Sequence, residues 1–108
     1  MAKVIQGTEE LDLQLTEAGD KLVLLYFSAV WCGPCMTMGP VVETMAGDSK
    51  YENVVFIKVD VDENEDIAER YDIEAMPTFK FIKGGEVVET VIGANHNALQ
   101  SKLEAVLA

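Results

Sequence analysis

Two continuous apolar runs set the strongest limit on how this chain can fold. The runs are "LVLLYFSAV" at residues 22–30 and "VVFIKV" at residues 54–59, and both are rich in aliphatic and β-branched side chains. Strands that are covered on both faces of a sheet have this composition, because neither face meets water. We therefore expect two central, parallel strands. Parallel neighbours need a crossover connection, and residues 34–49 are long enough to supply it as a helix.

Two further helices are predicted around this βαβ unit. Thr8 can cap a first helix, in which Leu11, Leu15 and Ala18 lie at helical spacing. Residues 63–71 predict another, shorter helix, because their apolar side chains are four positions apart and acids begin the segment.

The C-terminal third of the sequence predicts antiparallel strands, in contrast to the parallel strands predicted before it. After Pro77, the runs "TFKFI" and "EVVETVI" flank residues 83–86, where two glycines can adopt positive φ, and this pattern predicts a hairpin. Asn95 can cap a last helix with one apolar stripe. The expected fold class is therefore α/β, with a central mixed five-stranded sheet flanked by four helices. The stripe consists of Leu99, Leu103, Val106 and Leu107.

Length and charge narrow the classes of protein further. The 108 residues predict a single domain over residues 1–108, without linkers or repeats. The longest stretch without any polar residue, residues 22–27, is about a third of a membrane span, and the first ten residues do not resemble a secretory signal. We expect a soluble, cytoplasmic protein. Nineteen acidic against eight basic side chains give a net charge of −11, which disfavours nucleic acid and anionic membranes as partners.

The only two cysteines lie in "WCGPC", where the first apolar run meets the predicted crossover helix. Cys32 would lie at or just before the helix N-terminus, with Pro34 in the first turn. Unpaired N–H groups and the helix dipole favour a thiolate there, so the pKa of Cys32 should fall below that of a free cysteine. Cys35 would follow on the same face at a Cα separation of about 5 to 6 Å, which suits a disulfide.

Other interpretations of this pair are weaker. A disulfide that spans two residues removes little chain entropy, so a purely structural bridge is disfavoured. A metal site usually needs four ligands, and only His96 could join the two thiols. The acidic stretch "DVDENED" resembles the start of a calcium loop but lacks the glycine and glutamate that such a loop needs at its sixth and twelfth positions. A redox pair is favoured, in which Cys32 attacks a partner disulfide and Cys35 then displaces the partner.

Over nearly its whole length the chain resembles the thioredoxin family, especially its animal cytosolic members. The resemblance rests on "YFSAVWCGPC", Pro40 in the following helix, "VDVDEN", "MPTF", the Gly-Gly hairpin and "GAN". It implies the thioredoxin fold and a protein-disulfide oxidoreductase that binds no cofactor itself. Cys32 would be the nucleophile, Cys35 the resolving thiol, and Pro77 would be cis, facing the cysteines.

The resemblance also implies partners. Electrons would come from NADPH through a separate thioredoxin reductase, and substrates would be disulfide-containing proteins such as peroxiredoxins, bound by a monomer. A binding module whose thiols are secondary is the alternative, and a Cys32→Ser, Cys35→Ser variant distinguishes the two. The implied substrate-binding residues are Trp31, Gly33, Pro34, Met76, Pro77, Ile92, Gly93 and Ala94.

The chain departs from the family at two positions near the cysteines. Tyr26 stands where the family usually has a buried Asp that helps to deprotonate the resolving thiol, and a phenol is a poor base at neutral pH. Met36 replaces a common Lys or Arg. The two changes act on the pKa of Cys32 in opposite directions. We expect that pKa to stay depressed and resolution by Cys35 to be slow, with Tyr26 or Lys58, the latter through water, supporting proton transfer.

Overall fold

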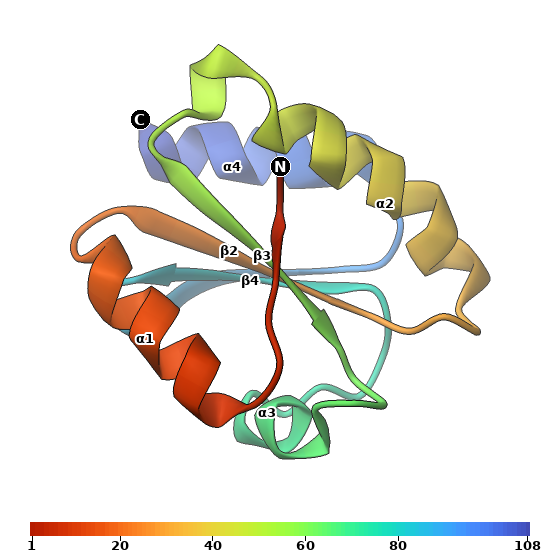
Figure 1. Ribbon diagram of the computed structural model, residues 1–108. Helices are drawn as coiled ribbons and strands as arrows, with labels where there is room; N and C mark the ends of the chain where they lie inside the picture. Colours follow the sequence, from red (N-terminus) through yellow and green to blue (C-terminus); the bar gives the residue numbers. More distant parts are fainter.

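A five-stranded sheet forms the centre of the molecule, and helices cover both of its faces (Figure 1). We describe the protein from a computed structural model that covers residues 1–108. In chain order the elements are β1 (Lys3–Val4), α1 (Thr8–Ala18), β2 (Leu22–Ser28), α2 (Gly33–Ala46), the 3-10 turn η1 (Ser49–Tyr51), β3 (Val54–Asp60), α3 (Glu65–Arg70), β4 (Thr78–Lys83), β5 (Glu86–Ile92) and α4 (His96–Leu107).

The sheet is mixed, with strand order β1-β3-β2-β4-β5. β1 and β2 pair with β3 in parallel, whereas β4 is antiparallel to both β2 and β5. All seven residues of β2 are buried, because this strand lies in the middle of the sheet and is covered on both faces. The predicted central parallel pair, the crossover helix and the hairpin are confirmed.

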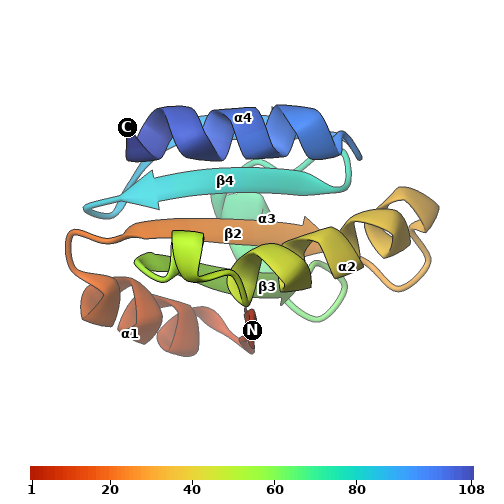
Figure 2. The ribbon, with the colours of Figure 1, turned by 90° about the horizontal axis from the view of Figure 1, so that it is seen from above.

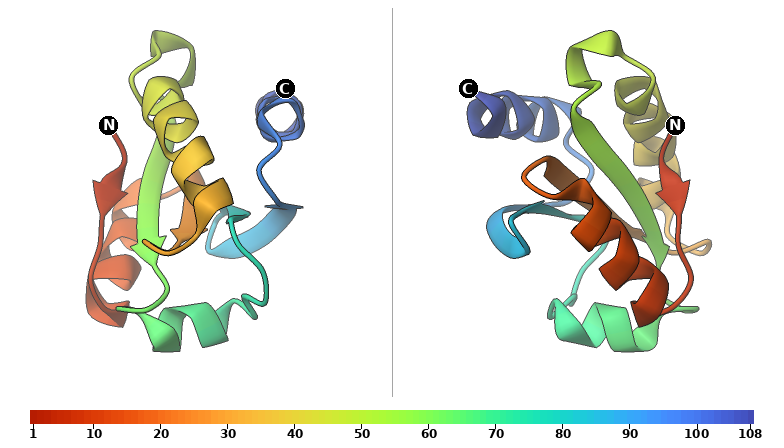
Figure 3. Two further views of the ribbon diagram at one scale, coloured as in Figure 1. Left: turned by 90° about the vertical axis from the view of Figure 1, so that its right-hand side faces the viewer. Right: turned by 60° about the vertical axis from the view of Figure 1, so that its left-hand side comes forward.

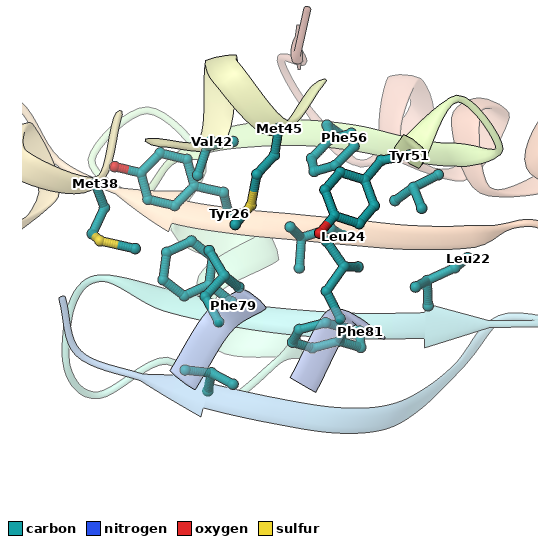
Figure 4. Packing of buried hydrophobic residues seen from close by; sticks show 14 residues of the cluster. Leu22, Leu24, Tyr26, Met38, Val42, Met45, Tyr51, Phe56, Phe79 and Phe81 are labelled. Carbon is teal, nitrogen blue, oxygen red and sulfur yellow. The ribbon is translucent and has the colours of Figure 1, made fainter. Parts of the chain in front are cut away.

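Two apolar cores fill the space between the sheet and the helices. α2 and α4 cover one face, and α1 and α3 cover the other (Figures 2 and 3). The core under α2 and α4 takes alternate side chains of β2 and β3, among them Leu24 and Phe56, and it continues to Phe79 and Phe81 of β4 (Figure 4). Met38 and Met45 of α2 are buried in it.

The first and last helices differ from expectation at their ends. Thr8 does not cap α1, because it is already the first helical residue; Gly7 is the N-cap, with a φ of 86° and no side-chain cap. In α4 Asn95 accepts a hydrogen bond from the Ala98 N–H as predicted. However, Leu107 is 42% exposed, so the predicted stripe is wrong at that residue. Eight positions after Leu99, it lies about 80° around the helix from that residue.

The hairpin turn between β4 and β5 is as predicted. Gly84 and Gly85 have φ values of 60° and 82°, a region that glycine reaches without a steric penalty. None of the helices combines the length and the apolar content that a membrane crossing requires.

Candidate active site

The two cysteines lie where β2 gives way to α2, at one end of the sheet. Cys32 is the N-cap of α2, and its backbone is extended (φ −91°, ψ 110°). Its Sγ accepts a hydrogen bond from the Cys35 N–H at 3.1 Å. Gly33 and Pro34 form the first turn, where the missing N–H of proline leaves no helix bond unmade. The predicted position of Cys32 at the helix N-terminus is therefore confirmed.

Cys32 and Cys35 are joined in a disulfide, with 5.2 Å between their Cα atoms. This separation agrees with the predicted value. Both residues are buried, and they form a small cluster with Ala29, against which Met76 packs. Cys32 nevertheless directly follows Trp31, whose side chain is strongly exposed. A pair at the tip of a helix can thus open and close without a change in the path of the backbone.

Exposed apolar side chains surround this buried disulfide. Val30, Trp31, Met36 and Ile92 are each between 64% and 78% exposed. Trp31 lies mostly in solvent, because its indole N–H donates to the Asp62 carboxylate at 2.7 Å and holds the ring outside the core. A patch of this kind next to a reactive group suits contact with another protein.

The segment before β4 also reaches the cysteines. The Met76–Pro77 peptide is cis, as the resemblance implies. The Pro77 carbonyl accepts a hydrogen bond from the Gly93 N–H at 2.9 Å, which fixes the end of β5 beside it. Met76, Pro77, Ile92 and Gly93 are thus brought together near the disulfide. Ala94, the next residue of this loop, is exposed.

Tyr26 lies below Cys35. Its hydroxyl donates to the Cys35 carbonyl oxygen at 2.6 Å, and its ring stacks on Phe79 with 5.1 Å between ring centroids (Figure 4). Burial raises the pKa of Tyr26 above its ordinary value near 10, and a hydrogen bond with Ser28 offsets part of this rise. The phenol therefore supports the backbone of Cys35, and its proton is directed at an oxygen and not at a sulfur.

A hollow of about 240 Å³ opens beside Cys35, and we call it the α2 hollow. Lys58, which the sequence had singled out, lines it, but so do Ser28 and Asp60, which sequence reasoning missed. Strand alternation could have indicated both, since they occupy the same face as Tyr26 and Lys58. The α2 hollow is lined by Tyr26, Ser28, Ala29, Val30, Cys35, Met36, Gly39, Pro40, Lys58 and Asp60.

His96, the one residue that could have joined the cysteines at a metal, is exposed at the start of α4. No three His, Cys, Asp or Glu side chains are arranged to hold a metal ion. In the acidic stretch, one Asp60 carboxylate oxygen accepts the Asp62 N–H at 2.9 Å, and Asn64 donates to the Asp60 carbonyl at 2.9 Å. These hydrogen bonds fix a turn in the acidic stretch after β3.

A reversible disulfide at the tip of a helix, presented by a mixed sheet with helices on both faces, defines a dithiol–disulfide oxidoreductase. The thioredoxin family model matches residues 3–105. The chain is 44% identical to the thioredoxin of Ictalurus punctatus over 99 residues, which cover 92% of each chain. The chain thus belongs to the thioredoxin family.

Solved structures agree with this assignment. The crystal structure of the Malassezia sympodialis thioredoxin is 40% identical and superposes with a TM-score of 0.90, over 96% of this chain and 91% of the other. A poplar thioredoxin h is 37% identical with a TM-score of 0.92, over 98% of this chain and 96% of that one. The predicted thioredoxin fold and oxidoreductase activity are confirmed.

Proposed function

We propose that Cys32 is the nucleophile that attacks the disulfide of a protein substrate and that Cys35 resolves the resulting mixed disulfide. The observation that carries this assignment is the hydrogen bond from the Cys35 N–H to the Cys32 sulfur at the N-terminus of α2. In the reduced protein this N–H and the helix dipole would stabilise a Cys32 thiolate. Cys35 does not lie at the N-terminus of α2, because it follows Cys32 by about one turn of the helix.

The substrate would lie as an extended segment across the cysteine end of the molecule. The backbone N–H and C=O of Met76 make no hydrogen bond to another backbone group, although Met76 packs against the cysteine cluster. Free backbone groups of this kind can pair with an extended peptide. Its side chains would contact an apolar surface formed by Trp31, Gly33, Pro34, Met76, Pro77, Ile92, Gly93 and Ala94.

Membership of the thioredoxin family supports the rest of the proposal. The oxidised protein would be reduced by a thioredoxin reductase that draws on NADPH, so that the chain carries electrons between two proteins and binds no cofactor. Its substrates would be disulfide-containing proteins such as peroxiredoxins, and it would act as a monomer in the cytoplasm. The surface charge supports protein partners and not nucleic acid or membranes, because it is strongly negative.

The test is reduction of insulin disulfides, coupled to NADPH consumption through a thioredoxin reductase. We expect turnover by the natural chain and none by Cys32→Ser. Cys35→Ser should form a mixed disulfide with insulin that persists, because nothing resolves it. Equal trapping by Cys32→Ser would reverse the two roles. Biological activity retained by the double serine variant would point to a binding module.

A further inference from the structure

We infer that Asp60 accepts the proton of Cys35 when this thiol resolves the mixed disulfide, through water in the α2 hollow. This assignment rests on the proposed roles of the two cysteines. It gives the reaction a proton acceptor on β3, at a position different from that of the Asp that Tyr26 replaces.

The register of the two central strands places Asp60 in the hollow. Tyr26 pairs with Lys58, and Ser28 pairs with Asp60, in adjacent parallel strands. Side chains two apart on a strand share a face, so all four lie on the face covered by α2. Earlier on the same strands that face is apolar core. Towards the cysteines it becomes a set of four polar side chains beneath the first turns of the helix.

The other polar groups of the hollow are unsuited to accept this proton. Tyr26 donates its own proton to the Cys35 carbonyl, and its burial raises its pKa. Lys58 carries an ammonium group, which has donors but no acceptor, and can only stabilise a developing thiolate. Ser28 is a neutral hydroxyl. Among the lining residues, Asp60 alone carries an anionic group.

The position of the Asp60 carboxylate is fixed. One of its oxygens accepts the Asp62 N–H at 2.9 Å, and this bond leaves the second oxygen available to the hollow. A hollow of about 240 Å³ with several polar groups has room for water molecules that connect Cys35 with Asp60.

The step is balanced in protons and electrons. The Cys35 thiol gives its proton through water to the Asp60 carboxylate, and the Cys35 sulfur attacks the Cys32 sulfur. The bond between Cys32 and the partner sulfur breaks, and its electron pair leaves on the partner as a thiolate. The proton then passes from Asp60 to solvent. The two protein thiols are oxidised to a disulfide, and the partner disulfide is reduced.

Asp60→Asn tests this assignment, because the amide oxygen can still accept the Asp62 N–H. Reduced protein is mixed with dithiobis-nitrobenzoate in a single turnover. The first nitrothiobenzoate released reports attack by Cys32, and the second reports resolution by Cys35. We expect the second release to slow at least about tenfold while the first stays within about twofold, since general-base catalysis contributes about 100-fold or more. Added formate should restore the second release in proportion to its concentration.

The matched control is Glu63→Gln. It removes the same charge three positions away, from an exposed side chain outside the hollow. We expect natural rates for both releases. The proposal is overturned if Asp60→Asn resolves at the natural rate, if both variants slow equally, or if formate has no effect on a variant with an unchanged urea midpoint. If instead the proposed role of Cys32 as nucleophile is wrong, the first release of nitrothiobenzoate will be missing.

Discussion

At the scale of single residues, Tyr26 decides how the backbone of Cys35 is held. A carboxylate in this buried place would need desolvation and a raised pKa, whereas the phenol is neutral and fits an apolar environment with one polar tip. That tip donates to the Cys35 carbonyl, so no carboxylate lies at this position below the disulfide. Tyr26 in place of the family's Asp should thus hold the backbone of Cys35 more firmly. The proton of the Cys35 thiol must then leave by another route.

Tyr26→Phe should destabilise the protein by about 1 kcal/mol, because it removes the hydrogen bond to the Cys35 carbonyl without changing the packing of the ring on Phe79. Urea denaturation of the oxidised protein measures this loss. Tyr71→Phe is the control, since the Tyr71 hydroxyl makes no hydrogen bond, and it should change the free energy of unfolding by less than about 0.5 kcal/mol. If both variants lose the same free energy of unfolding, the Tyr26 hydroxyl does not support the backbone of Cys35.

At the scale of elements, α2 has an unusual N-terminus. Its cap is a cysteine sulfur, and its first turn contains no acidic side chain. The usual cation after the second cysteine is also missing, because Met36 occupies that position and is 66% exposed. The helix N–H groups and dipole are therefore the main local source of positive potential at Cys32.

Met36→Lys should lower the pKa of Cys32 by adding a cation near the thiolate. We expect alkylation of Cys32 below neutral pH to become about twofold to fivefold faster, which corresponds to about 0.4 to 1 kcal/mol. Thr44→Lys, at the exposed far end of α2, carries the same charge and should leave this rate unchanged. If both lysines accelerate alkylation alike, net charge and not local potential controls the thiol.

The sequence allows most elements to be predicted, because β2 and β3 are continuous apolar runs and the cysteines interrupt the strand-to-helix junction. It does not reveal contacts between distant loops. Asn64 is buried, and its side-chain oxygen accepts the N–H of Gly7, the N-cap residue of α1, at 2.8 Å. Such a bond joins residues 57 positions apart, and no local pattern encodes it. Strand alternation places Asp60 on the same face as Lys58, but its position beside Cys35 depends on how α2 packs on the sheet, which the local pattern does not encode.

At the scale of the whole molecule, three tyrosines couple stability to alkaline pH. Burial raises the pKa of Tyr26, Tyr51 and Tyr71 above the ordinary value near 10. The folded protein thus holds these protons more tightly than the unfolded chain does. As the pH rises above about 10, the unfolded chain loses its phenolic protons first, and the free energy of unfolding falls.

We expect the urea midpoint of the oxidised protein, whose cysteines do not titrate, to be lower at about pH 11 than at about pH 9. Tyr26→Phe should reduce this difference, because it removes one of the three contributing phenols. A midpoint that stays constant or rises over this range would contradict the direction of the shifts.

The end of the last helix lies far from the cysteines. Figure 2 shows the C-terminus at the opposite end of the sheet from the beginning of α2. A tether or a further domain joined after Ala108 would leave the region around Cys32 uncovered. The protein can therefore be fixed to a solid support by its tail with the reactive tip outward, which makes it suited to capturing natural targets from a mixture through the Cys35→Ser variant.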